Sequence, residues 1–112
     1  MNILSGTPVI LGTELKLRVH VDPINDCQLQ DYDFEIEVYT NTVSVKYTKN
    51  DIQHIILPDE NRDTCIILLN TLDIGVGRVK VKITANIPDE DFIDGFRTEI
   101  AVEDTDIIVI RK

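Results

Sequence analysis

Apolar and polar residues alternate along five stretches of the chain: residues 13–21, 32–40, 43–48, 77–87 and 96–103. A period of two indicates a strand with one buried and one exposed face, and we expect the apolar face to be the buried one. In the first stretch, acidic and basic residues alternate with Leu15, Leu17, Val19 and Val21. The last stretch places together, on one face, Phe96, Thr98, Ile100 and Val102.

Two further segments, 65–70 and 106–111, are continuous apolar runs, which predict strands buried on both sides or placed centrally in a sheet. Turn-forming residues separate the seven predicted strands, and residues 40–42 are expected to close a tight hairpin. Seven short strands with frequent turns are typical of a two-sheet antiparallel β-sandwich of immunoglobulin-like type. We therefore predict a single all-β domain over residues 1–112.

Composition supports this prediction. The chain has 17 isoleucines, 11 valines and 10 threonines but only 2 alanines. β-Branched side chains suit a pleated sheet, whereas alanine is the strongest helix former. Residues 1–12 precede the first regular strand and are apolar in part, so we expect either an added edge strand or an arm that docks on a neighbouring subunit.

The net charge of −9 disfavours binding to nucleic acid or to an anionic membrane surface, because both require lysine and arginine near phosphates. It is compatible with a protein partner that carries basic or neutral patches. The amino terminus lacks the pattern of a secretory signal, so the protein either stays where it is made or leaves by a route that needs no signal. Nucleophile-elbow, phosphate-loop and dinucleotide-binding motifs are absent from the sequence, and we expect no catalytic residue.

Four carboxylates crowd the segment between the last two alternating stretches: Asp89, Glu90, Asp91 and Asp94. A weak calcium candidate would use Asp89, Asp91 and Asp94, although Ile93 fills a position where an EF-hand loop needs an oxygen ligand. The favoured interpretation is a solvated acidic turn, because Asp94-Gly95 is a strong turn dipeptide. We therefore predict no resident cofactor.

The cysteines and histidines give no metal-binding pattern. Cys65 opens an apolar run and is expected to be a buried thiol, whereas Cys27 lies in a polar loop. A disulfide between them stays open, although the missing signal favours a reducing compartment during folding. His20 and His54 lack specific ligand-like spacing and are interpreted as surface residues.

Charges are unevenly distributed over the predicted strands. An acidic stripe occupies the polar face of residues 33–37, and a basic stripe occupies that of residues 78–82. If these strands share a sheet, the stripes should pair with each other, at roughly 0.2–1 kcal/mol per opposed pair. The alternative is that one stripe faces a partner protein of opposite sign.

Three segments resemble a known group of proteins: "GTELKLRVHV", "DYDFEIEVYTNTVSVKYTKNDI" and above all "GRVKVKITANIPDEDFIDGFRTEI". They are similar to small β-sandwich virion domains of phages and prophages of gut Bacteroides. That group comprises auxiliary capsid (head-decoration) proteins and the amino-terminal attachment domains of head-fibre and baseplate proteins. The sequence stops at Arg111-Lys112 with no shaft or receptor-binding region after the sandwich, so we expect a stand-alone decoration or adaptor protein.

The resemblance implies a non-enzymatic virion protein that is made in the bacterial cytoplasm and binds the capsid exterior, stabilising it or providing an adaptor for fibres. Its partner would be the major capsid protein or another virion protein, with a homo-oligomer on the symmetric shell left open. We expect partner contacts at six apolar residues: Ile3, Leu4, Val9, Ile10, Phe92 and Ile93. The alternatives are a baseplate or tail adaptor domain, and a carbohydrate- or ligand-binding β-sandwich module.

Overall fold

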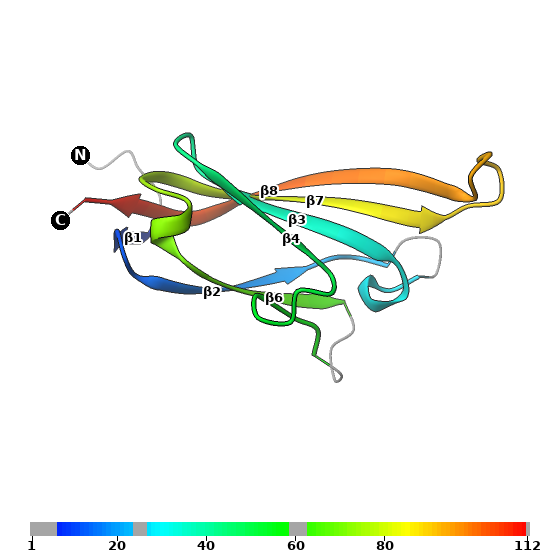
Figure 1. Ribbon diagram of the computed structural model, residues 1–112, viewed down its shortest axis with the longest axis horizontal. Coiled ribbons are helices and arrows are strands. Elements are labelled where there is room, and N and C mark those ends of the chain that lie inside the picture. The colour runs from blue at the N-terminus through cyan, green and yellow to red at the C-terminus, as the bar shows by residue number, and fades with distance from the viewer. Residues whose placement is uncertain (1–6, 24–26, 59–62, 112) are drawn as a thin grey trace.

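Two β-sheets pack face to face in the computed structural model, which describes residues 7–23, 27–58 and 63–111 (Figure 1). The elements follow one another in the order β1 (Thr7–Ile10), β2 (Glu14–His20), η1 (Leu29–Asp31), β3 (Asp33–Tyr39), β4 (Ser44–Thr48), β5 (Ile55–Ile56), β6 (Thr64–Asn70), η2 (Thr71–Asp73), β7 (Gly77–Pro88) and β8 (Phe96–Ile110). The two η elements are single 3-10 turns. The predicted all-β, two-sheet sandwich is confirmed.

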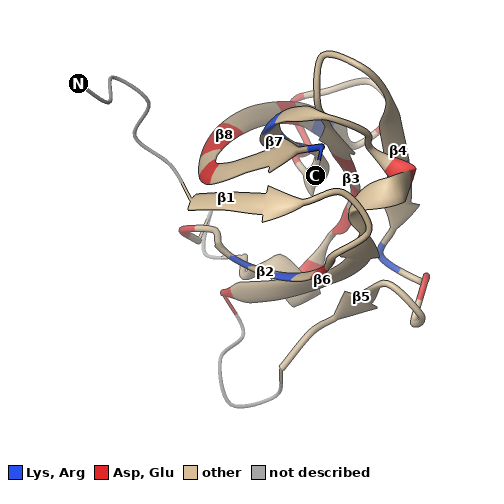
Figure 2. Cartoon of the chain, turned by 90° about the vertical axis from the view of Figure 1, so that its left-hand side faces the viewer, with Lys and Arg blue, Asp and Glu red and all other residues tan. Residues whose placement is uncertain are grey.

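The described strands divide unequally between the sheets. The large sheet has the order β1-β8-β7-β3-β4, and the small sheet has the order β2-β6-β5. Seen from one end, the large sheet curves over the small one (Figure 2). Neighbouring strands are antiparallel except β1 and β8, which run parallel. Because three strands face five, the small sheet covers only part of the inner surface of the large sheet.

Alternation in β2, β3 and β7 places their apolar residues between the sheets. The buried side chains of these strands are Leu15, Leu17 and Val19, then Phe34, Ile36 and Val38, then Val79, Val81, Ile83, Ala85 and Ile87. Each fully buried aliphatic side chain stabilises the fold by roughly 1.5–3 kcal/mol. The apolar run of β6 lies between β2 and β5 and buries residues 64–67 in succession, as its sequence predicted.

The carboxy-terminal part differs from the predicted strand pattern. Residues 96–103 and 106–111 were expected to be two strands, but residues 96–110 form the single strand β8. The pairing register of β7 and β8 shifts between Arg78 and Lys80, and β8 runs through this irregularity as one strand. At this end of β8, residues 107–110 pair with β1 and residues 108–109 pair with β7 as well, so the expected central position holds for that end alone.

The amino-terminal segment forms an edge strand where it is described. β1 pairs with the end of β8, and the Leu11 amide donates to the carbonyl of Ile110 at 2.8 Å. This confirms the edge-strand expectation for residues 7–10. Residues 1–6, which include Ile3 and Leu4, lie outside the described residues.

Two turns are tied together at the end of the molecule near β1. The predicted hairpin at residues 40–42 is present, and the Thr40 amide donates to the carbonyl of Val43 at 3.1 Å. The Thr40 hydroxyl donates to the carbonyl of Ile74, and the Thr42 hydroxyl donates to that of Val76 at 2.8 Å. These bonds join the β3–β4 turn to the segment that leads into β7.

Candidate interaction surface

Strand β8 turns its apolar face toward solvent. In its register with β7, Ile83 lies opposite Ala101 and Thr84 lies opposite Ile100. Directly opposed residues of antiparallel strands point to the same side of the sheet. Since Ile83 points into the core, Ala101 faces inward, whereas Ile100 faces outward.

The outward face of β8 therefore carries a row of exposed apolar side chains. The exposed fractions are 51% for Phe96, 60% for Ile100 and 56% for Val102, and we call these three residues the β8 stripe. The sequence placed them correctly on one face, but the expectation that this face is buried was wrong. They are the main surface residues that the sequence interpretation missed, because alternation identifies two faces without saying which of them meets the core.

The inward face of β8 is mostly charged. It presents, beside Ala101, the side chains of Arg97, Glu99 and Glu103. These charges are tolerated because the small sheet does not reach under this strand. Two adjoining hollows, of about 200 and about 430 Å³, separate β8 from β2 and share Val19, His20 and Glu103 in their walls. The sandwich is thus open along the side between β2 and β8.

β8 also has a free edge, by which we mean the side of residues 96–106 that faces away from β7. β1 pairs only with residues 107–110, and no other described residue pairs with that side of β8. The direction of its backbone groups follows from two bonds at its ends. The carbonyl of Gly95 accepts from the Asp89 amide on the β7 side, whereas that of Ile110 accepts from Leu11 on the β1 side.

Backbone groups alternate in direction along an antiparallel strand. Between residues 97 and 104, where the ladder to β7 is regular, odd-numbered residues of β8 therefore bond to β7, and even-numbered residues direct their N–H and C=O groups to the free edge. Along the free edge these are the groups of Thr98, Ile100, Val102 and Asp104. A row of unpaired backbone groups of this kind is a template for pairing with another strand.

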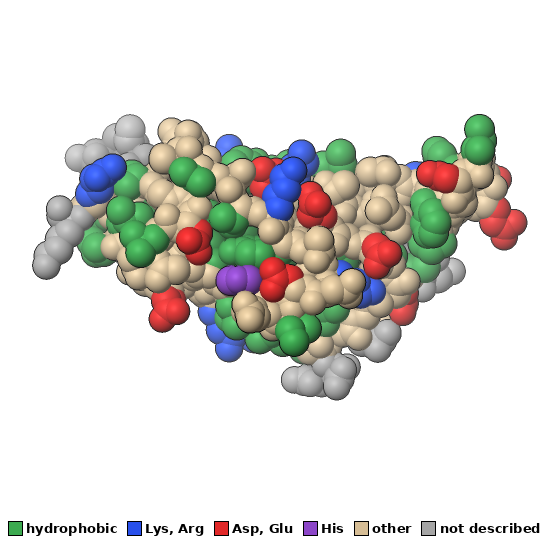
Figure 3. Space-filling view, in the orientation of Figure 1, with side chains coloured by type: hydrophobic (Ala, Val, Ile, Leu, Met, Phe, Trp, Pro, Cys, Tyr) green, Lys and Arg blue, Asp and Glu red, His purple; other side chains and the backbone are tan. Residues whose placement is uncertain are grey.

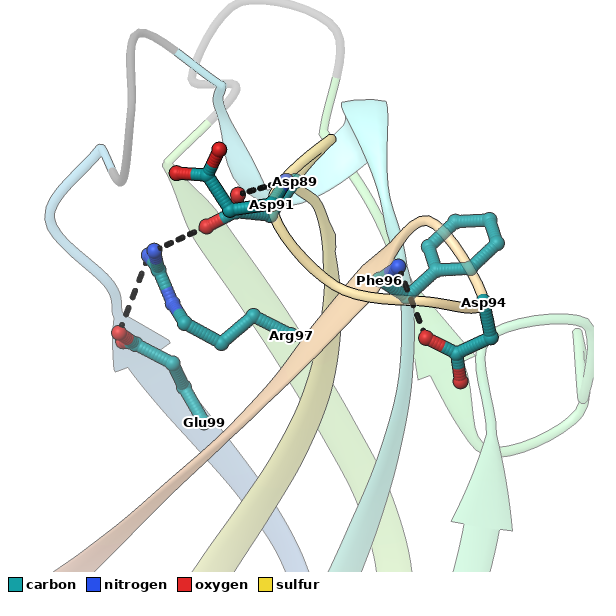
Figure 4. A network of polar contacts seen from close by, with 6 residues as sticks. All are labelled: Asp89, Asp91, Asp94, Phe96, Arg97 and Glu99. Carbon is teal, nitrogen blue, oxygen red and sulfur yellow. Dashed lines mark hydrogen bonds and ion pairs between the residues drawn. The ribbon is translucent and has the colours of Figure 1, made fainter.

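The four carboxylates singled out in the sequence lie at or beside the tip of the β7–β8 hairpin, and three of them are drawn in Figure 4. Asp89 accepts from the amide of Asp91 at 3.0 Å and from Arg97 Nη1 at 2.7 Å. Arg97 Nη2 also lies 3.3 Å from Glu99 Oε1. On the other side of the turn, Asp94 accepts from the amide of Phe96 at 3.2 Å.

These contacts give the acidic residues a structural role. Asp89 and Asp94 each bond a backbone amide two residues further on, which is the pattern of an Asx-turn. Two of the three calcium-candidate carboxylates thus already accept from protein donors and point to different sides of the turn (Figure 4). Within the described residues, no group of three or more His, Cys, Asp or Glu side chains is arranged to hold a metal ion.

The four predicted contact residues that the structure describes do not form one surface. Phe92 and Ile93 project from the hairpin tip, where hydrophobic side chains lie beside acidic ones (Figure 3). Val9 packs against the core, and Ile10 is exposed on β1. β1 and the hairpin tip lie at opposite ends of a molecule 50 Å long (Figure 1). The β8 stripe extends from the tip toward the middle of the molecule.

The two histidines have different surroundings. His20 is exposed beside Asp22, with Nε2 at 3.2 Å from Oδ1, as expected for a surface residue. His54 is half-buried instead: its ring stacks on Tyr47 with a centroid distance of 4.5 Å, and Nδ1 donates to the carbonyl of Leu68 at 2.8 Å. The interpretation of His54 as a surface residue therefore holds only in part, because its ring is half-buried and helps to join β4 to the small sheet.

The cysteines are not paired with each other. Both are free thiols; Cys65 is fully buried, and Cys27 is half-buried. The buried position predicted for Cys65 is confirmed. Desolvation by burial raises the pKa of Cys65 from 9.0 to about 12, so this thiol stays protonated at neutral pH.

The charged stripes lie on neighbouring strands, as the internal-pairing interpretation requires. β3 and β7 are adjacent, and Glu37 lies directly opposite Lys82. Glu35 is 3.9 Å from Lys46 of β4 in an exposed ion pair. Exposed pairs of this type are worth little individually, typically about 0–1 kcal/mol. The register thus brings one pair of opposite charges from the two stripes face to face, whereas Glu35 pairs with β4.

Comparison with known proteins finds no matching family model, no matching curated protein and no matching solved structure. The described residues also contain no helix of the length and apolar character needed to cross a membrane.

Proposed function

We propose that this chain is a non-enzymatic structural protein of a phage virion, which binds the capsid exterior through the outer face of β8. The binding part of the proposal is carried by the β8 stripe, whose three large apolar side chains are each more than half exposed. Contiguous exposed apolar surface with a polar rim is a common mark of protein–protein interfaces. The virion part is supported by the resemblance of three sequence segments to virion β-sandwich domains.

The surroundings of the β8 stripe suit a protein partner. Lys82 lies opposite Val102 on the same outer face, and Lys80 lies opposite Asp104, so polar residues of both signs border the apolar centre. Burying an apolar side chain of this size contributes roughly 1.5–3 kcal/mol. Repeated over the symmetric copies of a shell, modest contacts would add up to strong cementing of the capsid.

The test is co-sedimentation with empty shells assembled from the major capsid protein of the same genome. The wild-type chain should sediment with the shells. Ile100→Glu should bind the shells at least about tenfold more weakly than wild type, because it places a charge at the centre of the contact. Ile52→Glu should bind like wild type, since Ile52 is 84% exposed in the turn before β5, away from β8.

The two parts of the proposal fail differently. If the wild-type chain stays in the supernatant at micromolar concentration, the virion assignment is wrong. If it sediments and Ile100→Glu sediments equally well, the capsid binds another face and the β8 stripe is not the contact. Thermal melts of both variants confirm that any loss of binding is not a loss of folding.

A further inference from the structure

We propose that two copies of this chain associate through the free edge of β8, by antiparallel pairing of residues 96–104 of one copy with residues 104–96 of the other. The two large sheets would then form one continuous sheet across a two-fold axis. This inference uses the edge of β8, whereas the proposed function uses its outer face. Either one can therefore hold when the other fails.

The length of the free edge suits this pairing. On one side it ends at the hairpin tip, where residues 89–95 turn, and on the other side it ends at residue 107, where β1 begins to pair. Long, unprotected edges are uncommon, because their backbone groups readily pair with other strands. The acidic inward-facing residues of β8 discourage indiscriminate pairing, and the occupant must accommodate them.

A second copy accommodates them in one register. When Ile100 lies opposite Ile100 of the second copy, Arg97 lies opposite Glu103 of that copy, and the reciprocal pair forms by symmetry. These odd-numbered residues form non-hydrogen-bonded pairs across the new ladder, in which opposed side chains are closest. Arg97 and Glu103 both face inward and are equally distant in sequence from Ile100, so each of the two symmetric pairs brings opposite charges together.

The neighbouring registers are worse. Shifting the axis toward the hairpin tip by one step places Glu99 opposite Glu99 of the second copy. Shifting it the other way places Glu99 opposite Glu103 of the second copy, twice by symmetry. Like charges directly opposite each other destabilise a ladder. Of these three registers, the charge pattern of β8 favours the one centred on Ile100, in which a second copy of the chain fits the free edge.

The pairing would also enlarge the apolar outer face. In this register Thr98 lies opposite Val102 of the second copy, and the two isoleucines at position 100 are adjacent on the outer side. The two β8 stripes then lie side by side across the axis. Isologous contacts of this kind, in which the same patch is used by both subunits, are the commonest basis of homodimers.

The first experiment is sedimentation equilibrium of the wild-type chain, Thr98→Pro and Thr98→Val. The wild type should be dimeric at high protein concentration. Thr98→Pro removes an amide that faces the free edge and leaves the ladder to β7 intact, so it should weaken the dimer at least about tenfold. Thr98→Val keeps that amide and should dimerise like wild type; both variants lose the Thr98 hydroxyl contact with Asn86 Oδ1 equally.

The second experiment tests the register by oxidative cross-linking in a Cys27→Ser background. Ile100→Cys places two thiols opposite each other across the axis and should form a disulfide-linked dimer. Thr98→Cys faces Val102 of the second copy instead and should not cross-link to itself. Cys65 is fully buried and does not interfere.

Three results would overturn the inference. The first is a wild-type chain that remains monomeric at the highest attainable concentration. The second is a Thr98→Pro variant that dimerises as well as Thr98→Val. The third is cross-linking of both cysteine variants, or of neither.

Discussion

Cys65 lies near the start of β6, the central strand of the small sheet, opposite Val19 of β2. Its sulfur is surrounded by core side chains and makes no disulfide. The apolar run that it opens was enough to predict this position, because free cysteine behaves as a small hydrophobic residue. Its chemical consequence, a pKa raised to about 12 by burial, depends on how completely both sheets enclose it.

The buried thiol predicts a stability change at high pH. The unfolded chain loses the Cys65 proton near its ordinary pKa of 9.0, whereas the folded chain keeps it until about pH 12. The stabilisation is therefore complete below pH 9 and is lost as the pH rises toward 12, by about 1.4 kcal/mol per pH unit.

Urea unfolding at increasing pH measures this effect, with Cys65→Ala as the comparison. The alanine variant should be less stable at neutral pH, because it leaves a small cavity, but its stability should fall less steeply above pH 9. The raised pKa values of Tyr32 and Tyr47 act in the same direction in both proteins and cancel in the comparison. Parallel pH profiles for the two proteins would show that Cys65 ionises freely in the folded state.

At the scale of elements, the sequence predicted where the strands lie, but for β8 it did not predict which face of the strand is buried. Alternation located β2, β3, β4 and β7 and the continuous run located β6, because period two depends only on local backbone geometry. The outward orientation of β8 could not be predicted in this way. It depends on the register with β7, and a shift of one residue in that register would turn the β8 stripe inward.

The acidic turn sets that register. Pro88 lies opposite Phe96, and the residues between them are held by the Asx-type bonds of Asp89 and Asp94. The sequence identified these carboxylates as part of a turn, and the structure shows that this turn aligns β7 with β8 in their observed register. Arg97 extends the same network by joining Asp89 to Glu99. A side-chain network of this kind cannot be inferred until the two strands are aligned.

The tie between the β3–β4 turn and the segment before β7 gives a prediction at this scale. Gly75 has a φ of +74°, and a Cβ there would lie 2.9 Å from Thr42 Cγ2. Gly95 has a similar φ of +84° with nothing within 4 Å of an added Cβ. Both Gly→Ala substitutions carry a backbone cost of roughly 1–2 kcal/mol, but only Gly75→Ala adds a steric clash.

We therefore expect Gly75→Ala to lower the free energy of unfolding by more than Gly95→Ala, measured by urea denaturation. Thr42→Ser removes the clashing methyl group and keeps the hydroxyl that donates to Val76. Combined with Gly75→Ala, it should recover part of the lost stability. Equal effects of the two alanine substitutions, with no recovery by Thr42→Ser, would mean that the two turns are not packed together.

At the scale of the whole molecule, the sandwich is open between β2 and β8 on one side, whereas on the other side the stacking of Tyr47 on His54 joins β4 to the small sheet. The unequal sheets leave β8 with charged residues inside, apolar residues outside and an unpaired edge in the described structure. Fold class followed from composition and period, but this asymmetry did not, because it arises from how many strands each sheet contains. Both proposals depend on it.

Amide hydrogen exchange along β8, resolved by residue in a sample dilute enough to be monomeric, tests this arrangement most directly. We expect the even-numbered residues Thr98, Ile100 and Val102 to exchange fast, because their amides face the free edge. Glu99, Ala101 and Glu103 should exchange slowly, because theirs bond to β7. Uniform protection along β8 would mean that the edge is covered, and uniform fast exchange would mean that β8 is not held in the sheet; either result would contradict the account.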